Sequence, residues 1–126
     1  MSELILYVDT SQVHEGRLEE LKRAMKELAE FVDTNVPRAI AYNVYFTEDG
    51  TRMTVAQLHP DPASLEYHMK VAGPAFPKLG EFLELMRIEI YGKPSDELLK
   101  LLRQKAELLG KGTVVVHDLH AGFARL

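Results

Sequence analysis

The chain of 126 residues has no cysteine, no tryptophan and no long apolar run. Without cysteine it can form no disulfide, no thiolate zinc site and no cysteine nucleophile. No apolar stretch approaches the ~20 residues of a membrane-spanning helix, and the first ten residues lack the basic start and the longer apolar run of a signal peptide. We therefore expect a cytoplasmic protein with no membrane partner.

Basic residues are scattered along the chain, and the formal net charge is −4. A nucleic-acid-binding protein typically carries a basic face, so we expect no nucleic-acid partner. Hydrophobic residues make up 46% of the chain and charged residues 27%, enough apolar material for a packed core. With no repeat and no linker, residues 1–126 are expected to form a single domain.

Hydrophobic periodicity divides the chain into strands and helices. Five stretches have the alternation or β-branched composition of strands: 3–9, 39–46, 51–59, 83–91 and 113–125. Four stretches have helical spacing or helix-capping signals: 15–32, 61–71, 76–82 and 95–110. The order β-α-β-β-α-β, followed by α-β, predicts an α+β, ferredoxin-like split βαβ antiparallel sheet. Residues 95–126 form a C-terminal helix-strand extension.

Local signals support these boundaries. Asp49-Gly50 offers the positive φ angles of a tight hairpin turn. Asp61 and Ser95 are suitable N-caps for the helices that follow them. Gly110 is expected to end its helix as a left-handed cap.

Alternation sorts the strand residues into two sets, one for each face of the sheet. The set expected beneath the helices is Leu4, Leu6, Val8, Ile40, Tyr42, Val44, Phe46, Thr54, Ala56, Leu58, Met86, Ile88 and Ile90. The other set is Ile5, Tyr7, Asp9, Ala39, Ala41, Asn43, Tyr45, Met53, Val55, Gln57, His59, Leu85, Arg87, Glu89 and Tyr91. The second set is too apolar for a solvated surface, which favours a homodimer through this face. The alternative is that the C-terminal helix and strand cover it within one chain.

His68 is the most informative candidate for catalysis. With Leu65 and Met69 it lies on the apolar stripe of the helix from Asp61, so its imidazole is expected to point between helix and sheet. Histidine exchanges protons near neutral pH, but a core histidine with one hydrogen bond fits the pattern equally well. Asp9, at the predicted end of the first strand, is the nearest candidate partner, although a strand-end carboxylate is as often a cap.

Five residues are expected to bind a ligand: Tyr42, Asn43, Gln57, Leu65 and Met69. Each polar one, like Tyr7, could instead be an ordinary core or interface hydrogen-bonding residue. No metal site is predicted, because His117 and His120 are three apart in a predicted strand and would point to opposite faces. The charged residues of the first and last helices are expected to be solvated.

Three segments resemble the dimeric α/β barrel superfamily, in its antibiotic biosynthesis monooxygenase (ABM)-like branch. They are Tyr42-Asn43-Val44-Tyr45-Phe46, Met53-Thr54-Val55-Ala56-Gln57-Leu58-His59 and Asp61-Pro62-Ala63-Ser64-Leu65-Glu66-Tyr67-His68-Met69. The resemblance covers residues 3 to 91 and implies a homodimer with a small-molecule cavity between sheet and helices. Haem-degrading members of the superfamily use a tryptophan, and its absence argues against that activity.

The resemblance implies one of three functions. The first is a cofactor-independent monooxygenase acting on an aromatic or quinol-type substrate, with His68 as base and Asp9 or Asn43 orienting it. The second is a non-catalytic or stress-related homodimer that binds a small aromatic or apolar molecule. The third is an oligomerisation module in which His68 belongs to the core. No cofactor is expected.

Overall fold

The computed structural model describes residues 3–126. Its strands are β1 (Ile5–Val13), β2 (Ala41–Phe46), β3 (Arg52–His59), β4 (Leu83–Tyr91) and β5 (Gly110–His117). Its helices are α1 (Leu18–Asn35), α2 (Pro62–Ala72), α3 (Phe76–Leu79) and α4 (Asp96–Leu109), with the 3₁₀ turn η1 (Gly73–Ala75) between α2 and α3. Within residues 3–126, no helix has the length and apolar composition to cross a bilayer.

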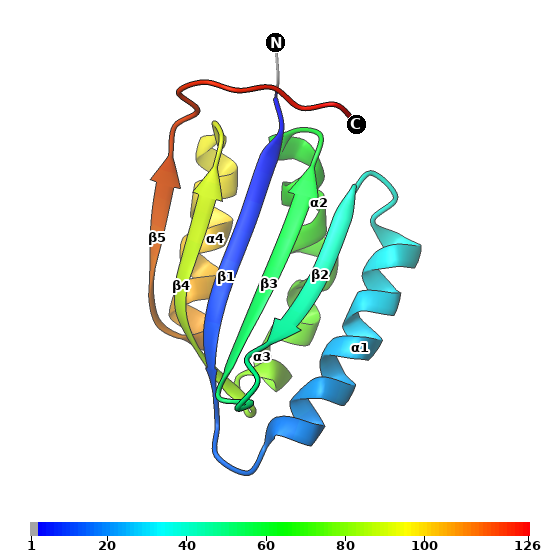
Figure 1. Ribbon diagram of the computed structural model, residues 1–126, viewed down its shortest axis with the longest axis vertical. Coiled ribbons are helices and arrows are strands. Elements are labelled where there is room, and N and C mark those ends of the chain that lie inside the picture. The colour runs from blue at the N-terminus through cyan, green and yellow to red at the C-terminus, as the bar shows by residue number, and fades with distance from the viewer. Residues whose placement is uncertain (1–2) are drawn as a thin grey trace.

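The five strands form one sheet in the order β2-β3-β1-β4-β5 (Figure 1). The first four strands pair antiparallel in the order of a ferredoxin-like sheet, as predicted. β5 adds to β4 in parallel through α4, which makes the complete sheet mixed. The fold is therefore α+β and ferredoxin-like, with a C-terminal helix-strand extension.

Most of the capping predictions are confirmed. Asp61 accepts a hydrogen bond from the Ser64 amide at 2.9 Å, and Ser95 accepts one from the Leu98 amide at 3.0 Å. Gly50 has a φ of +71° in the β2–β3 turn. The prediction for Gly110 is wrong, because its backbone is extended and it begins β5 directly after α4. A Cβ at Gly110 would lie 2.7 Å from the Leu85 carbonyl oxygen, so close strand approach accounts for this glycine.

The helices α1, α2 and α4 all pack on one side of the sheet. Figure 1 shows α2 and α4 behind the strands and α1 along the β2 edge, and α4 contacts α2, α3, β4 and β5. The C-terminal extension therefore does not cover the opposite face as the alternative supposed. β5 adds an edge strand to the sheet next to β4, and α4 adds a helix to the layer that contains α1 and α2.

The predicted faces of β1 and β3 are reversed in the structure. The residues that face the helices in β1 are Ile5, Tyr7, Asp9, Ser11 and Val13, and those in β3 are Met53, Val55, Gln57 and His59. The prediction placed the more apolar set inside, whereas polar side chains are buried here because they find hydrogen-bond partners. In β2 the prediction for Tyr42, Val44 and Phe46 is confirmed, because they pack against the core.

In β4 the alternation breaks at a register shift. Leu85 and Ile88 are both buried although three residues apart, and Met86 between them is 39% exposed. The pairing shifts between Thr10 and Ser11 on β1 and between Leu85 and Arg87 on β4. An irregularity of this kind moves one side chain to the other face of the sheet. A prediction based on strict alternation therefore places Leu85 and Met86 on the wrong faces.

We call the helix-free side of the sheet the open face. Its apolar members are Leu6, Val8, Tyr45, Ala56, Leu58, Tyr91 and Val115. They surround a polar group in which Glu89 pairs with Arg87 at 3.5 Å and with His117 at 3.2 Å, and the rings of Tyr91 and His117 stack at 4.3 Å. The open face thus carries a patch of apolar side chains around a polar group. The prediction for its residues is wrong at Ile5, Met53, Val55 and Leu85, which are buried under the helices.

Candidate functional site

A group of polar side chains lies buried between the sheet and the helices. Asp9 comes from β1, Gln57 and His59 from β3, His68 from α2 and Lys105 from α4. All five are at most 8% exposed. Because burying polar groups costs free energy unless they are paired, the contacts within this group decide what it can do.

One part of this group centres on Asp9. Its Oδ2 accepts hydrogen bonds from the Tyr7 hydroxyl and from Lys105 Nζ, the latter at 3.2 Å. Lys105 Nζ also donates to the Tyr7 oxygen at 2.7 Å and lies 4.6 Å from the centre of the Phe76 ring. Burial and the neighbouring carboxylate of Asp9 raise the pKa of Tyr7, so its hydroxyl remains protonated. Asp9 and Lys105 thus form a buried ion pair beside the aromatic rings of Tyr7 and Phe76.

The other part is a chain of hydrogen bonds that ends at His68. The Ser64 hydroxyl and His59 Nδ1 lie 2.7 Å apart, and His59 Nε2 lies 2.9 Å from Gln57 Oε1. The Gln57 amide nitrogen then lies 3.3 Å from His68 Nε2. Gln57 is thus the residue that orients His68, in place of Asp9 or Asn43.

The two histidines of this hydrogen-bond chain, His59 and His68, are neutral at neutral pH. Burial lowers the pKa of His68 to about 3, and the nearby positive charge of Lys105 acts in the same direction. Burial also lowers the pKa of His59 to about 4. Neither imidazole therefore has the near-neutral pKa expected of a histidine base.

Two buried polar atoms of the group have no hydrogen-bond partner within residues 3–126. They are Asp9 Oδ1 and His68 Nδ1. Both residues line a cavity of about 20 Å³, large enough for about one water-sized group. Its walls include Ser11 and Lys105 and are otherwise mainly apolar. The pair therefore offers hydrogen-bonding capacity to whatever enters this cavity.

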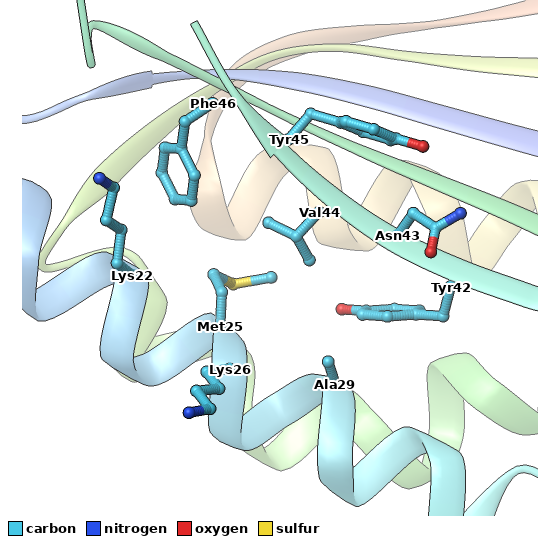
Figure 2. A pocket seen from close by; sticks show the side chains of 9 residues that line it. All are labelled: Lys22, Met25, Lys26, Ala29, Tyr42, Asn43, Val44, Tyr45 and Phe46. Carbon is cyan, nitrogen blue, oxygen red and sulfur yellow. The ribbon is translucent and has the colours of Figure 1, made fainter. Parts of the chain in front are cut away.

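A wider groove of about 480 Å³ runs between α1 and β2. Figure 2 shows Tyr42, Val44 and Phe46 pointing toward Met25 and Ala29 of the helix. Met25 and Tyr42 line both the groove and the cavity, so the two spaces adjoin at these side chains. Burial raises the pKa of Tyr42, which keeps its phenol neutral at this boundary.

The structure brings most of the predicted site residues together. Asp9, Gln57, Leu65, His68 and Met69 are buried on the helix side of the sheet, and Tyr42 is partly buried beside them. Asn43 is the exception. It is exposed and alternates with the inward-pointing Tyr42 and Val44, so it lies away from the buried group, although it is among the residues that line the groove between α1 and β2.

Sequence reasoning missed Lys105, His59 and Ser64 as members of the site. The prediction that the charged residues of the last helix are solvated is wrong for Lys105, which lies on the buried stripe of α4 with Leu98, Leu102, Ala106 and Leu109. A lysine on an apolar stripe is the signal that could have revealed it. His59 and Ser64 carried no comparable signal, because their pairing depends on how α2 packs on β3.

Residues 3–126 contain no group of three or more histidine, aspartate or glutamate side chains placed to hold a metal ion. His117 ends β5 and contacts Glu89, while His120 lies beyond the strand.

No family model matches the sequence, and no curated protein matches it either. Solved structures match by shape. MupZ from Pseudomonas fluorescens is 21% identical, with 99% of this chain and 91% of that chain covered and a TM-score of 0.78. A candidate antibiotic biosynthesis monooxygenase from Caulobacter crescentus is 19% identical, with coverage of 75% and 92% and a TM-score of 0.66.

SnoaB, a cofactor-independent oxygenase from Streptomyces nogalater, is 13% identical, with 75% of this chain and 96% of that chain covered and a TM-score of 0.63. The match to MupZ spans nearly the whole chain, so it includes the extension formed by α4 and β5. At these identities the likeness concerns the fold. This chain therefore shares its ferredoxin-like fold with structures that include a candidate antibiotic biosynthesis monooxygenase and a cofactor-independent oxygenase.

Proposed function

We propose that this protein is an enzyme that oxygenates a phenolic aromatic substrate with dioxygen and without a bound cofactor. The observation that carries the proposal is the pair of unpartnered buried atoms, Asp9 Oδ1 and His68 Nδ1, which share one mainly apolar cavity. Leaving such groups unsatisfied costs about 1–3 kcal/mol each, a cost that a bound polar ligand would remove. The oxygenase named among the structures of similar fold supports the same reaction class.

The α1–β2 groove is the proposed substrate site. Its volume of about 480 Å³ is in the range of small-molecule pockets. Apolar and aromatic side chains form its inner wall, which suits a flat aromatic ring. Movement of Met25 and Tyr42 would let the polar end of a substrate reach Asp9 and His68.

The proposed chemistry begins with removal of the phenol proton. The Asp9 carboxylate is the proton acceptor, because its Oδ1 has no partner in the described chain and His68 is difficult to protonate. The phenolate then supplies an electron pair to dioxygen, and a C–O bond forms at a ring carbon that carries hydrogen. Loss of water leaves a quinone, so one oxygen atom enters the product and the other leaves with two hydrogens. Excluding bulk water protects the intermediate.

Oxygen uptake with a panel of phenols and polycyclic phenols tests this function. Asp9→Asn is expected to lower turnover about 10²-fold or more, the usual size of an acid–base contribution. His68→Ala removes a hydrogen-bonding group from the cavity and is expected to lower turnover by about 10²-fold or more, the usual cost of losing one preorganised donor. Asp118→Asn, the same change in the exposed tail, serves as the matched control. If either site variant keeps full turnover of a substrate that the parent oxidises, its assigned role is wrong. Phenol binding without oxygen consumption would favour the alternative, a ligand-binding protein.

We further propose that two copies pair through the open face. Its exposed apolar members, including Leu6 at 38% and Tyr45 at 56%, form a patch that a second copy would remove from water. Val8 lies at the centre of the sheet, between Ala56 on β3 and Glu89 on β4.

Sedimentation at several concentrations tests this pairing. The parent protein is expected to sediment as a dimer, and Val8→Arg as a monomer. The guanidinium would have to be desolvated at the centre of the contact, and the neighbouring Glu89 already pairs with Arg87 and His117. Leu108→Arg makes a similar change on the outer surface of α4 and is expected to leave the dimer intact. A parent protein that stays a single subunit at high concentration would rule the pairing out.

A further inference from the structure

We infer that Gln57 and His59 fix the tautomer of His68, so that its neutral ring presents an N–H group, at Nδ1, to the cavity. In this role Gln57 and His59 are positioning residues. The consequence is specific, because a histidine that presents N–H donates a hydrogen bond, whereas one that presents a lone pair accepts a proton.

The direction of each hydrogen bond follows from the orientation of the Gln57 amide, whose Oε1 faces His59 and whose Nε2 faces His68. Its Oε1 can only accept, so His59 Nε2, at 2.9 Å, must carry the proton of that contact. Its Nε2 can only donate, so His68 Nε2, at 3.3 Å, must offer its lone pair. A neutral imidazole carries one N–H, which for His68 is then at Nδ1.

The far end of the hydrogen-bond chain is compatible with this direction, because a serine hydroxyl can either donate or accept. With the His59 proton on Nε2, its Nδ1 is an acceptor, and the Ser64 hydroxyl at 2.7 Å is its donor. The chain therefore runs without conflict from Ser64 through His59 and Gln57 to His68. Its members are at most 3% exposed, so bulk water does not compete for these bonds.

The cavity thus receives one donor and one acceptor. His68 Nδ1–H is the donor, and Asp9 Oδ1 is the acceptor. A single hydroxyl oxygen, such as that of a phenol, satisfies both, because it can accept from His68 and donate to Asp9, and the cavity holds about one such group. This last step rests on the proposed function. In that reaction His68 would stabilise negative charge on the substrate oxygen, and Asp9 would be the base.

Nitrogen-15 NMR of the substrate-free protein tests the tautomer directly. Long-range correlations from the ring C–H protons report which nitrogen of each imidazole is protonated, and the His68→Gln spectrum assigns the signals of His68. We expect a single neutral form of His68 with the proton on Nδ1 at pH 7. A proton on Nε2 in the parent protein would overturn the inference, and this result needs no variant to fold.

Gln57→Leu tests the positioning role. Without the amide, His68 Nε2 loses its donor, so we expect the Nε2-protonated form to become populated. Tyr42→Phe is the matched control, because its ring lies 5.6 Å from that of His68 and the change leaves the chain intact. A folded Gln57→Leu protein with His68 still entirely Nδ1-protonated would refute the role of Gln57. These spectra require no substrate, so they stand whether or not oxygen uptake is found.

Discussion

Replacement of Lys105 by methionine is expected to destabilise the protein by about 3–5 kcal/mol, the usual cost of breaking a buried ion pair on one side. Methionine retains the length and apolar stem of lysine, so the change removes mainly the ammonium group. Asp9 would keep the Tyr7 hydroxyl as a donor but lose its only cationic contact among the described ion pairs. Urea unfolding at pH 7 measures the free energy of unfolding.

Two further variants separate charge from packing. Lys100→Met makes the same change at an exposed position of α4 and is expected to have little effect. Adding Asp9→Asn to Lys105→Met removes the charge left behind, so the double variant is expected to recover much of the lost stability. If the two single effects simply add in the double variant, the two side chains do not act as a pair.

Acidification from pH 6.5 to pH 4 is expected to destabilise the folded protein steeply. His59 and His68 have pKa values lowered from 6.5 to about 4 and about 3, so in this range the unfolded chain binds protons that the folded chain does not. Stability therefore rises with pH in this window and is lost as the pH falls. With two protons involved, the slope approaches about 2.7 kcal/mol per pH unit.

The range of pH distinguishes the histidines from the carboxylates. Hydrogen bonds lower the pKa of Asp49 and Asp61 from 3.8, so their contribution is present above that value and is lost only at lower pH. His68→Gln is expected to remove about half of the slope between pH 6.5 and 4. Urea unfolding across this range measures it, and an unchanged slope in the variant would show that His68 is not one of the two groups.

The elements and their order were predictable from local chemistry. The Asp49-Gly50 turn, the Asp61 and Ser95 caps and the periodicity of α1, α2 and α4 act within a few residues, so they can be read without tertiary structure. β5 was predicted too long because residues 118–126 are rich in apolar side chains but lie outside the sheet. The sequence of these residues has no local signal that indicates where the pairing of β5 with β4 ends.

The site was predictable only in part. The position of His68 on the apolar stripe of α2 correctly indicated a buried imidazole. The hydrogen-bond partner of His68 was not predictable. Gln57 contacts His68 only because its side chain lies on the face of β3 that is turned toward the helices. The reversal of faces in β1 and β3 had the same origin. Both sets of side chains contain apolar residues, and composition alone favoured the set without Asp9, Gln57 and His59.

The amino-acid sequence by itself determined the kind and order of the elements and the absence of cysteine chemistry, since each depends on residue type and near neighbours. The tertiary structure alone decided which polar groups lie inside and what they contact. Asp9 and Lys105 are 96 positions apart and meet only when α4 packs on the sheet. Such a pair is favourable only after folding has excluded water from both groups, and for that reason local sequence carries little trace of it.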